Sequence, residues 1–208
     1  TALTGAAQIA TGQTITGLKQ QTGDTQVGAL VVGTDKKIYM LYGNDVSDYI
    51  LTVHSPEATC VPYTLQNIGF AHFWDVNGLT QLMTSQAYGS FQSHILTQAV
   101  QPFIDQKKNK TIASCVSRAN NLYKIFFTDG DGLNIQIMPN SNSTSPVVGD
   151  VMPFNYGNRI VNVADSVVDI NGVERKFIGC TDGFVYEIDV GTSIDGDPLE
   201  SFLILSFN

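Results

Sequence analysis

The stretch FIGCTDGFVYEID, residues 177–189, contains two short apolar runs separated by Thr181-Asp182-Gly183. Aromatic and β-branched runs favour β-strands. Asp followed by Gly favours a tight turn, because the Asp side chain can bond to the backbone two residues on and Gly adopts the left-handed conformation. The stretch therefore predicts a β-hairpin in which Asp182 is a turn residue and not a catalytic acid.

The same pattern occurs twice more, in FAHFWDVNGLTQL (residues 70–82) and YKIFFTDGDGLNIQI (residues 123–137). The turn glycines are Gly78, Gly130 and Gly183, with steps of 52 and 53 residues between them. A near-constant period in an all-β chain indicates propeller blades or a similar array. At roughly 40–50 residues per blade, the chain supplies about four blades, so the array is small, partial or completed by chain outside this sequence. The predicted turn residues, expected to have at most local backbone partners, are Asp75, Asp129 and Asp182.

The chain divides into an N-terminal segment and one domain. Residues 1–27 are rich in Thr, Gly, Gln and Ala and predict a linker or extended arm with one strand near residues 14–18. Residues 28–208 predict an all-β domain, a β-propeller-like array of antiparallel blades with one short helix near 92–106. Apolar residues at steps of three and four place that helix at Ile95 to Ile104, with Pro102 kinking or restarting it.

Composition limits the classes of function. Asp and Glu number 19 and Lys and Arg 11, for a formal charge of -8, which argues against wrapping nucleic acid, since that needs a basic stripe. The sequence contains no run of about 18 apolar residues, so it predicts no membrane span. The first twelve residues lack the pattern of a signal peptide. Because the sequence starts at Thr1, a trimmed start or a piece of a longer protein is expected. Cys60, Cys115 and Cys180 are expected to be buried thiols in a reducing compartment.

The motifs of common active sites are missing from the sequence. His54, His72 and His94 lack the spacing of metal ligands. DGDG at residues 129–132 lacks the later acids of a calcium loop and predicts a hairpin turn, as does Asp195-Gly196-Asp197. GxSxG, GxxxxGK[ST] and GxGxxG do not occur. We therefore predict no catalytic, cofactor-binding or metal-ligating residue, no cofactor and no enzymatic activity.

Two stretches resemble a known family. KIYMLYGNDVSDYILTVHSPEATCVPYTLQNIGFAHFWDVNGLTQL (residues 37–82) contains a Gly-x-Asp-x-x-Asp-Tyr turn, Cys-x-Pro and Asp-x-x-Gly-Leu. DGFVYEIDVGTSIDGDPLESFLILSFN (residues 182–208) contains Gly-Thr-Ser-x-Asp-Gly-x-Pro-Leu before a final strand. Residues 28–208 thereby resemble the β-propeller-bearing tail tubular or nozzle protein of short-tailed bacteriophages and related tail-hub proteins, which are usually longer than this chain. The resemblance implies a structural virion protein, without catalytic residues, that forms a ring around the DNA exit path.

These expectations together describe a component of the DNA-ejection conduit in the phage tail, made in the bacterial host cytoplasm. Its partners would be copies of itself in a ring and other tail proteins; DNA would pass without specific binding, and no membrane would be involved. Basic residues are expected in turns and loops, and most of them would lie away from the narrowest passage; they are Lys36, Lys37, Lys107, Lys108, Lys110, Arg175 and Lys176. The alternatives are a carbohydrate- or receptor-binding β module and a hydrolase on a propeller scaffold.

Overall fold

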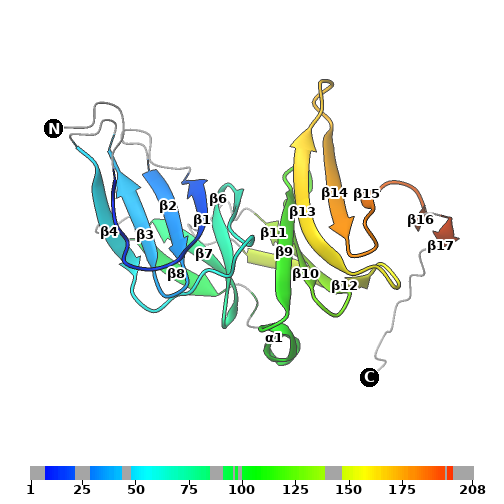
Figure 1. Ribbon diagram of the computed structural model, residues 1–208, viewed down its shortest axis with the longest axis horizontal. Coiled ribbons are helices and arrows are strands. Elements are labelled where there is room, and N and C mark those ends of the chain that lie inside the picture. The colour runs from blue at the N-terminus through cyan, green and yellow to red at the C-terminus, as the bar shows by residue number, and fades with distance from the viewer. Residues whose placement is uncertain are drawn as a thin grey trace.

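The computed structural model describes residues 8–21, 29–43, 48–84, 91–95, 97, 100–138, 147–194 and 196–198. These residues form antiparallel sheets that follow one another along the chain, with one short helix (Figure 1). The expected all-β class with a short helix is therefore confirmed. The final apolar strand expected in residues 201–207, and Asp195 of the predicted last turn, lie outside the described residues.

Four sheets are built as simple meanders, in which each strand pairs with the next one in sequence. The first sheet contains β1 (Ile15–Gln20), β2 (Ala29–Thr34), β3 (Ile38–Tyr42) and β4 (Ile50–Ser55). The second contains β5 (Gln66–Ile68), β6 (Phe70–Asp75), β7 (Gly78–Thr84) and β8 (Phe91–Ile95). The third contains β9 (Thr111–Ser117), β10 (Leu122–Phe127), β11 (Asp131–Met138) and β12 (Val147–Asn155). The fourth contains β13 (Val161–Val168), β14 (Glu174–Cys180) and β15 (Val185–Ile188), and a ribbon of β16 (Ser193–Ile194) and β17 (Asp197–Pro198) follows.

The strand expected near residues 14–18 is present as β1 and pairs with β2. The predicted boundary between arm and domain at residue 28 therefore falls between two strands of the first sheet. The predicted hairpins are also present. Gly78 is the first residue of the third strand of its sheet, and Gly130 and Gly183 lie in the turn just before the third strand of theirs; their φ angles are 118°, 88° and 87°. The sequence period thus marks one turn that recurs in successive sheets.

The backbone shows that the first, third and fourth sheets are repeats of one design. In each, the residue after the second strand donates its N–H to the carbonyl of the residue before the first strand. These bonds join Asp35 to Thr14 (3.1 Å), Thr128 to Lys110 (2.7 Å) and Thr181 to Ile160 (2.9 Å). The register of the first strand also shifts by one residue at the same place in each of these sheets. The extra residue forms a β-bulge, which bends the strand; it is Thr16, Ile112 or Asn162.

Among the described residues, the core consists of three apolar clusters, one between each pair of successive sheets. Neighbouring residues of a strand point to opposite faces, so the middle sheets bury both faces. On β6, Phe73 packs toward the first sheet and Trp74 toward the third. On β10, Phe127 packs toward the second sheet and Phe126 toward the fourth. This explains why these strands are nearly continuous apolar runs in the sequence.

The first strands of the sheets meet in order along the array. β1 contacts β5, β5 contacts β9, and β9 contacts β13. The sheets are therefore stacked face to face with their first strands adjacent. The described strands form a row of four sheets, and no closed propeller or barrel is seen in them (Figure 1).

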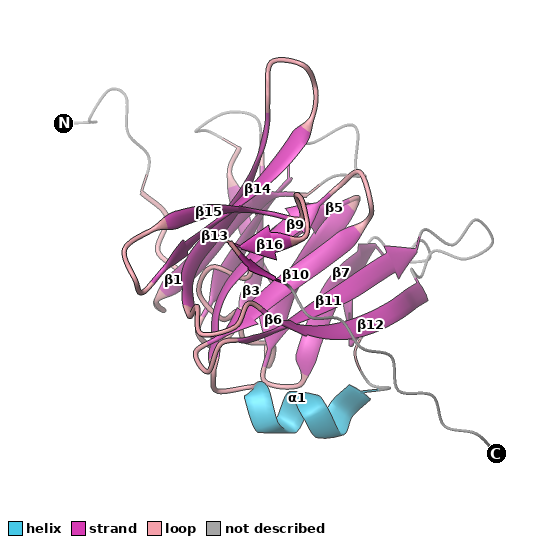
Figure 2. Cartoon of the chain, turned by 90° about the vertical axis from the view of Figure 1, so that its right-hand side faces the viewer, coloured by secondary structure: helices cyan, strands magenta, loops and turns pink. Residues whose placement is uncertain are grey.

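The helix prediction was wrong in its bounds. Ile95 belongs to β8 and lies opposite Thr80 of β7, whereas α1 runs over Gln101–Lys107. Pro102 lies in the first turn of α1, where backbone N–H groups have no acceptor within the helix. Its lack of an N–H therefore costs no hydrogen bond, and Pro102 starts the helix and does not kink it. Of the residues whose spacing suggested a helix, Ile95 ends the fourth strand of the second sheet, whereas Phe103 and Ile104 lie in α1. Figure 2 shows α1 at the end of the sheets opposite the hairpin between β13 and β14.

Candidate functional site

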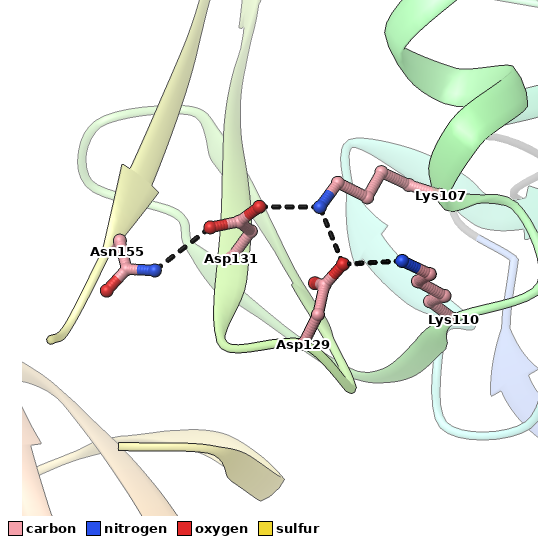
Figure 3. A network of polar contacts seen from close by, with 5 residues as sticks. All are labelled: Lys107, Lys110, Asp129, Asp131 and Asn155. Carbon is pink, nitrogen blue, oxygen red and sulfur yellow. Dashed lines mark hydrogen bonds and ion pairs between the residues drawn. The ribbon is translucent and has the colours of Figure 1, made fainter. Parts of the chain in front are cut away.

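The densest charged cluster joins α1 to the third sheet (Figure 3). The Lys107 Nζ at the end of α1 lies 2.6 Å from Asp129 Oδ2 and 2.5 Å from Asp131 Oδ2. The Lys110 Nζ lies 2.9 Å from the same Asp129 oxygen, and Asn155 Nδ2 donates to Asp131 Oδ1 at 2.9 Å. Asp129 comes from the turn between β10 and β11, Asp131 is the first residue of β11, and α1 supplies the central ammonium.

Burial and charge fix the protonation of this cluster. The Lys107 side chain is only 11% exposed, and its Nζ lies 5.7 Å from the Phe103 ring centroid and 5.9 Å from that of Phe127, within cation–π range. Burial alone would lower the pKa of Lys107, but its hydrogen bonds to both carboxylates outweigh burial and raise it. Burial alone would raise the pKa of Asp129, but the hydrogen bonds and charges of Lys107 and Lys110 lower it to about 2.

Lys107, Asp129 and Asp131 are therefore all ionised throughout the physiological pH range. A carboxylate with so low a pKa is a poor general base, and an ammonium that donates to two carboxylates is a poor nucleophile. Its chemistry suits a clamp that holds α1 against the turn between β10 and β11. The prediction that Asp129 has only local backbone partners is wrong, because Lys107 lies 22 residues earlier.

The other two predicted turn aspartates differ from each other. Asp75 is only 5% exposed, and its Oδ1 accepts from the N–H of Thr59 at 3.1 Å and from the Thr59 hydroxyl at 2.6 Å. Asp75 therefore ties the turn to a segment 16 residues earlier, and the local prediction is wrong here too. Asp182 Oδ1 accepts from the Phe184 N–H at 2.9 Å, as predicted for a turn, while its Oδ2 accepts from the Tyr186 hydroxyl at 2.8 Å.

A second charged cluster lies between the third and fourth sheets and was not anticipated from the sequence. Lys124 Nζ on β10 lies 2.9 Å from Asp189 Oδ1, and Lys176 Nζ on β14 lies 3.3 Å from Asp189 Oδ2. The two lysine side chains are 3% and 9% exposed, and Lys124 Nζ lies 5.2 Å from the Phe154 ring centroid. The expectation that the named basic residues sit in turns and loops is wrong for three of them: Lys107 ends α1, and Arg175 and the buried Lys176 are residues of β14. The sequence signal that could have revealed this cluster is a single lysine within an apolar strand, as in YKIFF.

Among the described residues, the histidine and cysteine side chains do not come together in a cluster that could bind a metal ion. His72 is buried, its Nδ1 lies 2.8 Å from the Phe70 carbonyl, and burial lowers its pKa to about 4, so the ring is neutral at pH 7. Burial also lowers the pKa of His54 to about 4, and the side chain of His94 lies outside the description. The three cysteines are free and buried, as predicted.

In the described part of the chain, no three His, Cys, Asp or Glu side chains are grouped as they would be around a metal ion. Among the same residues, no helix has the length and apolar character that crossing a bilayer requires.

Surfaces are the remaining candidates for function. The first and fourth sheets each pack one face against a neighbouring sheet. We call their other faces the first open face (on β1–β4) and the fourth open face (on β13–β15). Leu18 and Val53 are exposed at the two edges of the first open face, but Val32 and Tyr39 between them are buried, whereas Val163 and Val185 are exposed on the fourth open face. Exposed apolar patches of this kind mark interaction sites.

Comparison of the sequence with protein-family models and with curated proteins finds no match. Any inference about function therefore rests on the sequence and structure of this chain alone. The features that bear on it are the repeated sheets, the paired charges inside them and the two open faces.

Proposed function

We propose that the chain is a structural subunit of a short-tailed phage tail, a β-propeller-like unit of the nozzle or tail tube through which DNA is ejected. The observation that carries this proposal is the row of four meander sheets stacked face to face with their first strands in contact. A propeller arranges antiparallel sheets around a central channel, which brings the same strand of every sheet toward that channel. The recurring bulge and turn bond of three sheets support such a repeat.

The charges support a passage that DNA crosses without adhering. The formal charge is -8, and most basic groups are already engaged within the chain. Eight basic side chains lie within ion-pair distance of a carboxylate: Lys107, Lys108, Lys110, Arg118, Lys124, Arg159, Arg175 and Lys176. Duplex DNA carries one negative charge per ~1.7 Å, and screening limits repulsion to roughly 8 Å at physiological salt. An acidic wall therefore acts only where it comes close to the DNA.

In this proposal, copies of the chain form a closed ring together with other tail proteins in the virion. A conduit needs an enclosed path, and heterologous contacts close when the rotation fits a whole number of copies. Basic residues of turns, such as Lys36 and Lys37 between β2 and β3, would lie away from the narrowest passage.

Native mass spectrometry and a DNA-retention assay test this proposal together. We expect the purified chain to form a closed oligomer and to leave duplex DNA unbound at physiological salt. A matched variant, Asp35→Lys with Asp150→Lys, reverses two exposed acids and should gain salt-dependent retention, which shows that the assay detects binding. A stable monomer at high concentration, or tight DNA binding by the unaltered chain with a steep salt slope, would contradict the proposal.

A further inference from the structure

The second charged cluster holds more positive than negative charge. Lys124 Nζ and Lys176 Nζ both pair with the one carboxylate of Asp189, at 2.9 Å and 3.3 Å. An ammonium carries three N–H donors. Among the described residues, Lys124 uses one of them in a hydrogen bond, to Asp189, and Lys176 makes no hydrogen bond beyond its ion pair. Two buried positive charges therefore share a single negative charge.

The described residues supply no second carboxylate to balance this charge. Glu174 lies two residues before Lys176 on the same face of β14, but it already pairs with Arg118 at 3.4 Å. Asp165 and Glu187 belong to the neighbouring cross-strand row, so they point to the opposite face of the fourth sheet from Lys176. Burying a charge without a partner is costly. The cluster is therefore suited to an anion that comes from outside the chain.

Solvent reaches the cluster at the outer edge of the third and fourth sheets. The first strands β9 and β13 are in contact, and the third sheet has four strands where the fourth has three described ones. β12 therefore has no described strand of the fourth sheet opposite it, and Met152 on β12 is 48% exposed. The Asp189 side chain, which contacts both ammoniums, is 31% exposed. A small ion can approach the two ammoniums from this side.

Asn134 on β11 adds a group that can accept a hydrogen bond. It stands directly opposite Lys124 in the register, so the two side chains lie on the same face with their Cβ atoms about 5 Å apart. The Asn134 Oδ1 is buried and has no hydrogen-bond partner in the protein. The cluster thus offers ammonium donors together with one free acceptor. A hydrogen phosphate group matches both, because its oxygens accept hydrogen bonds and its P–OH donates one.

We propose that Lys124, Lys176 and Asn134 form a binding site for a hydrogen phosphate group, carried by the free ion or by a phosphate monoester. The phosphate oxygens accept from the two ammoniums, and the P–OH donates to Asn134 Oδ1. Asp189 keeps its ion pair with Lys124. The phosphodiesters of duplex DNA have no P–OH, so the DNA backbone does not fit this site. The site does not depend on the proposed role in the tail.

Isothermal titration calorimetry with sodium phosphate at about pH 6 measures this binding directly. At about this pH a phosphate monoester is half protonated, so both forms of the ligand carry a P–OH. We expect a Kd of roughly 0.1–1 mM, since even the best ligands of five non-hydrogen atoms reach only about micromolar Kd. Sulfate carries no proton at this pH and should bind at least about 10-fold more weakly. Glycerol phosphate separates the two sources: its binding indicates a phosphorylated molecule, and its failure to bind indicates the free ion.

Lys176→Met and Lys108→Met form a matched pair, since each removes one positive charge. The Lys108 side chain is 40% exposed and its Nζ lies 3.9 Å from Asp105, so Lys108→Met should bind phosphate as the unaltered chain does. Lys176→Met should bind phosphate at least about 10-fold more weakly. In phosphate-free buffer it should be at least as stable as the unaltered chain in thermal melting, because Lys124 and Asp189 then form a balanced pair. Circular dichroism confirms that each variant folds.

Several outcomes would overturn the site. The first is an unaltered chain that gives no heat of binding with phosphate, and the second is equal binding of phosphate and sulfate. The third is a Lys176→Met variant that binds phosphate normally. The fourth is a Lys176→Met variant that is less stable than the unaltered chain in phosphate-free buffer, since the protein's own carboxylates would then need Lys176. If Lys176→Met does not fold, the preference of the unaltered chain for phosphate over sulfate decides.

Discussion

Replacing Lys107 by Met should destabilise the protein because it removes the ammonium that bridges two carboxylates while keeping most of the packing volume. Lys107 Nζ donates to Asp129 and to Asp131, and hydrogen bonds to charged groups contribute roughly 1.5–3 kcal/mol each. Removing one partner of a fully buried pair costs about 3–5 kcal/mol. Here the carboxylates are 29% and 41% exposed and can be rehydrated, so we expect about 2 kcal/mol, or roughly 4–8 °C in Tm for a chain of this size.

The pH dependence gives the sharper signature. The folded pKa of Asp129 is about 2 against an ordinary value of 3.8. A carboxylate with a depressed folded pKa stabilises the fold fully above its unfolded pKa, and that stabilisation is lost as pH falls toward the folded pKa. The stability difference between the unaltered protein and Lys107→Met should therefore be constant from pH 7 to about 4 and should shrink from there toward pH 2.

The matched control is Lys108→Met, one residue along, where Nζ lies 3.9 Å from Asp105 and the side chain is 40% exposed. It should change stability by less than about 0.5 kcal/mol. Urea denaturation at pH 7, 4 and 3, followed by tryptophan fluorescence, measures all three proteins; Trp74 is buried in the cluster that receives Ile104 of α1. Equal effects of the two substitutions, or a difference for Lys107→Met that does not shrink below pH 4, would refute the clamp.

Three other predictions concern buried groups. Asp75→Ala leaves the N–H and hydroxyl of Thr59 without their acceptor and should cost about 1–3 kcal/mol in chemical denaturation; an unchanged midpoint would show that water replaces the carboxylate. Gly33→Ala places a Cβ 2.7 Å from Cys60 Sγ and should lower the thermal midpoint by an overpacking cost of about 1–3 kcal/mol. Burial raises the pKa of Cys60 to about 11 and of Cys115 to about 12, so both thiols should resist a thiol reagent at pH 8 until the protein unfolds; rapid labelling of the folded chain would contradict their burial.

The hairpins and their period could be predicted from the sequence because each depends on local residues. Asp or Asn beside Gly between apolar runs favours a turn, so the turns at Gly78, Gly130 and Gly183 were found in equivalent places. The bounds of α1 could not be found in the same way. Ile95, the first residue of the helical spacing, pairs in β8 with Thr80 of the second sheet, and this tertiary pairing overrides the local preference.

The partners of the charged residues could not be predicted because they come from distant parts of the chain. Asp129 has the local sequence of a turn aspartate, and it occupies that turn, but its ion pairs depend on where α1 ends. Lys176 lies among apolar strand residues, and nothing near it in sequence shows that Asp189 and Lys124 meet it between two sheets. Turn chemistry is encoded within a few residues, whereas buried charge pairs become visible only once the sheets are stacked.

Locating the chain in a phage particle tests the central claim most directly. An epitope inserted at Asn171, in the exposed tip of the β13–β14 hairpin, can be labelled with gold-conjugated antibody fragments and imaged by electron microscopy. We predict several labels per particle, arranged around the tail axis at the DNA exit. Labels on the capsid shell, or particles that assemble and eject DNA without the chain, would contradict a role in the conduit.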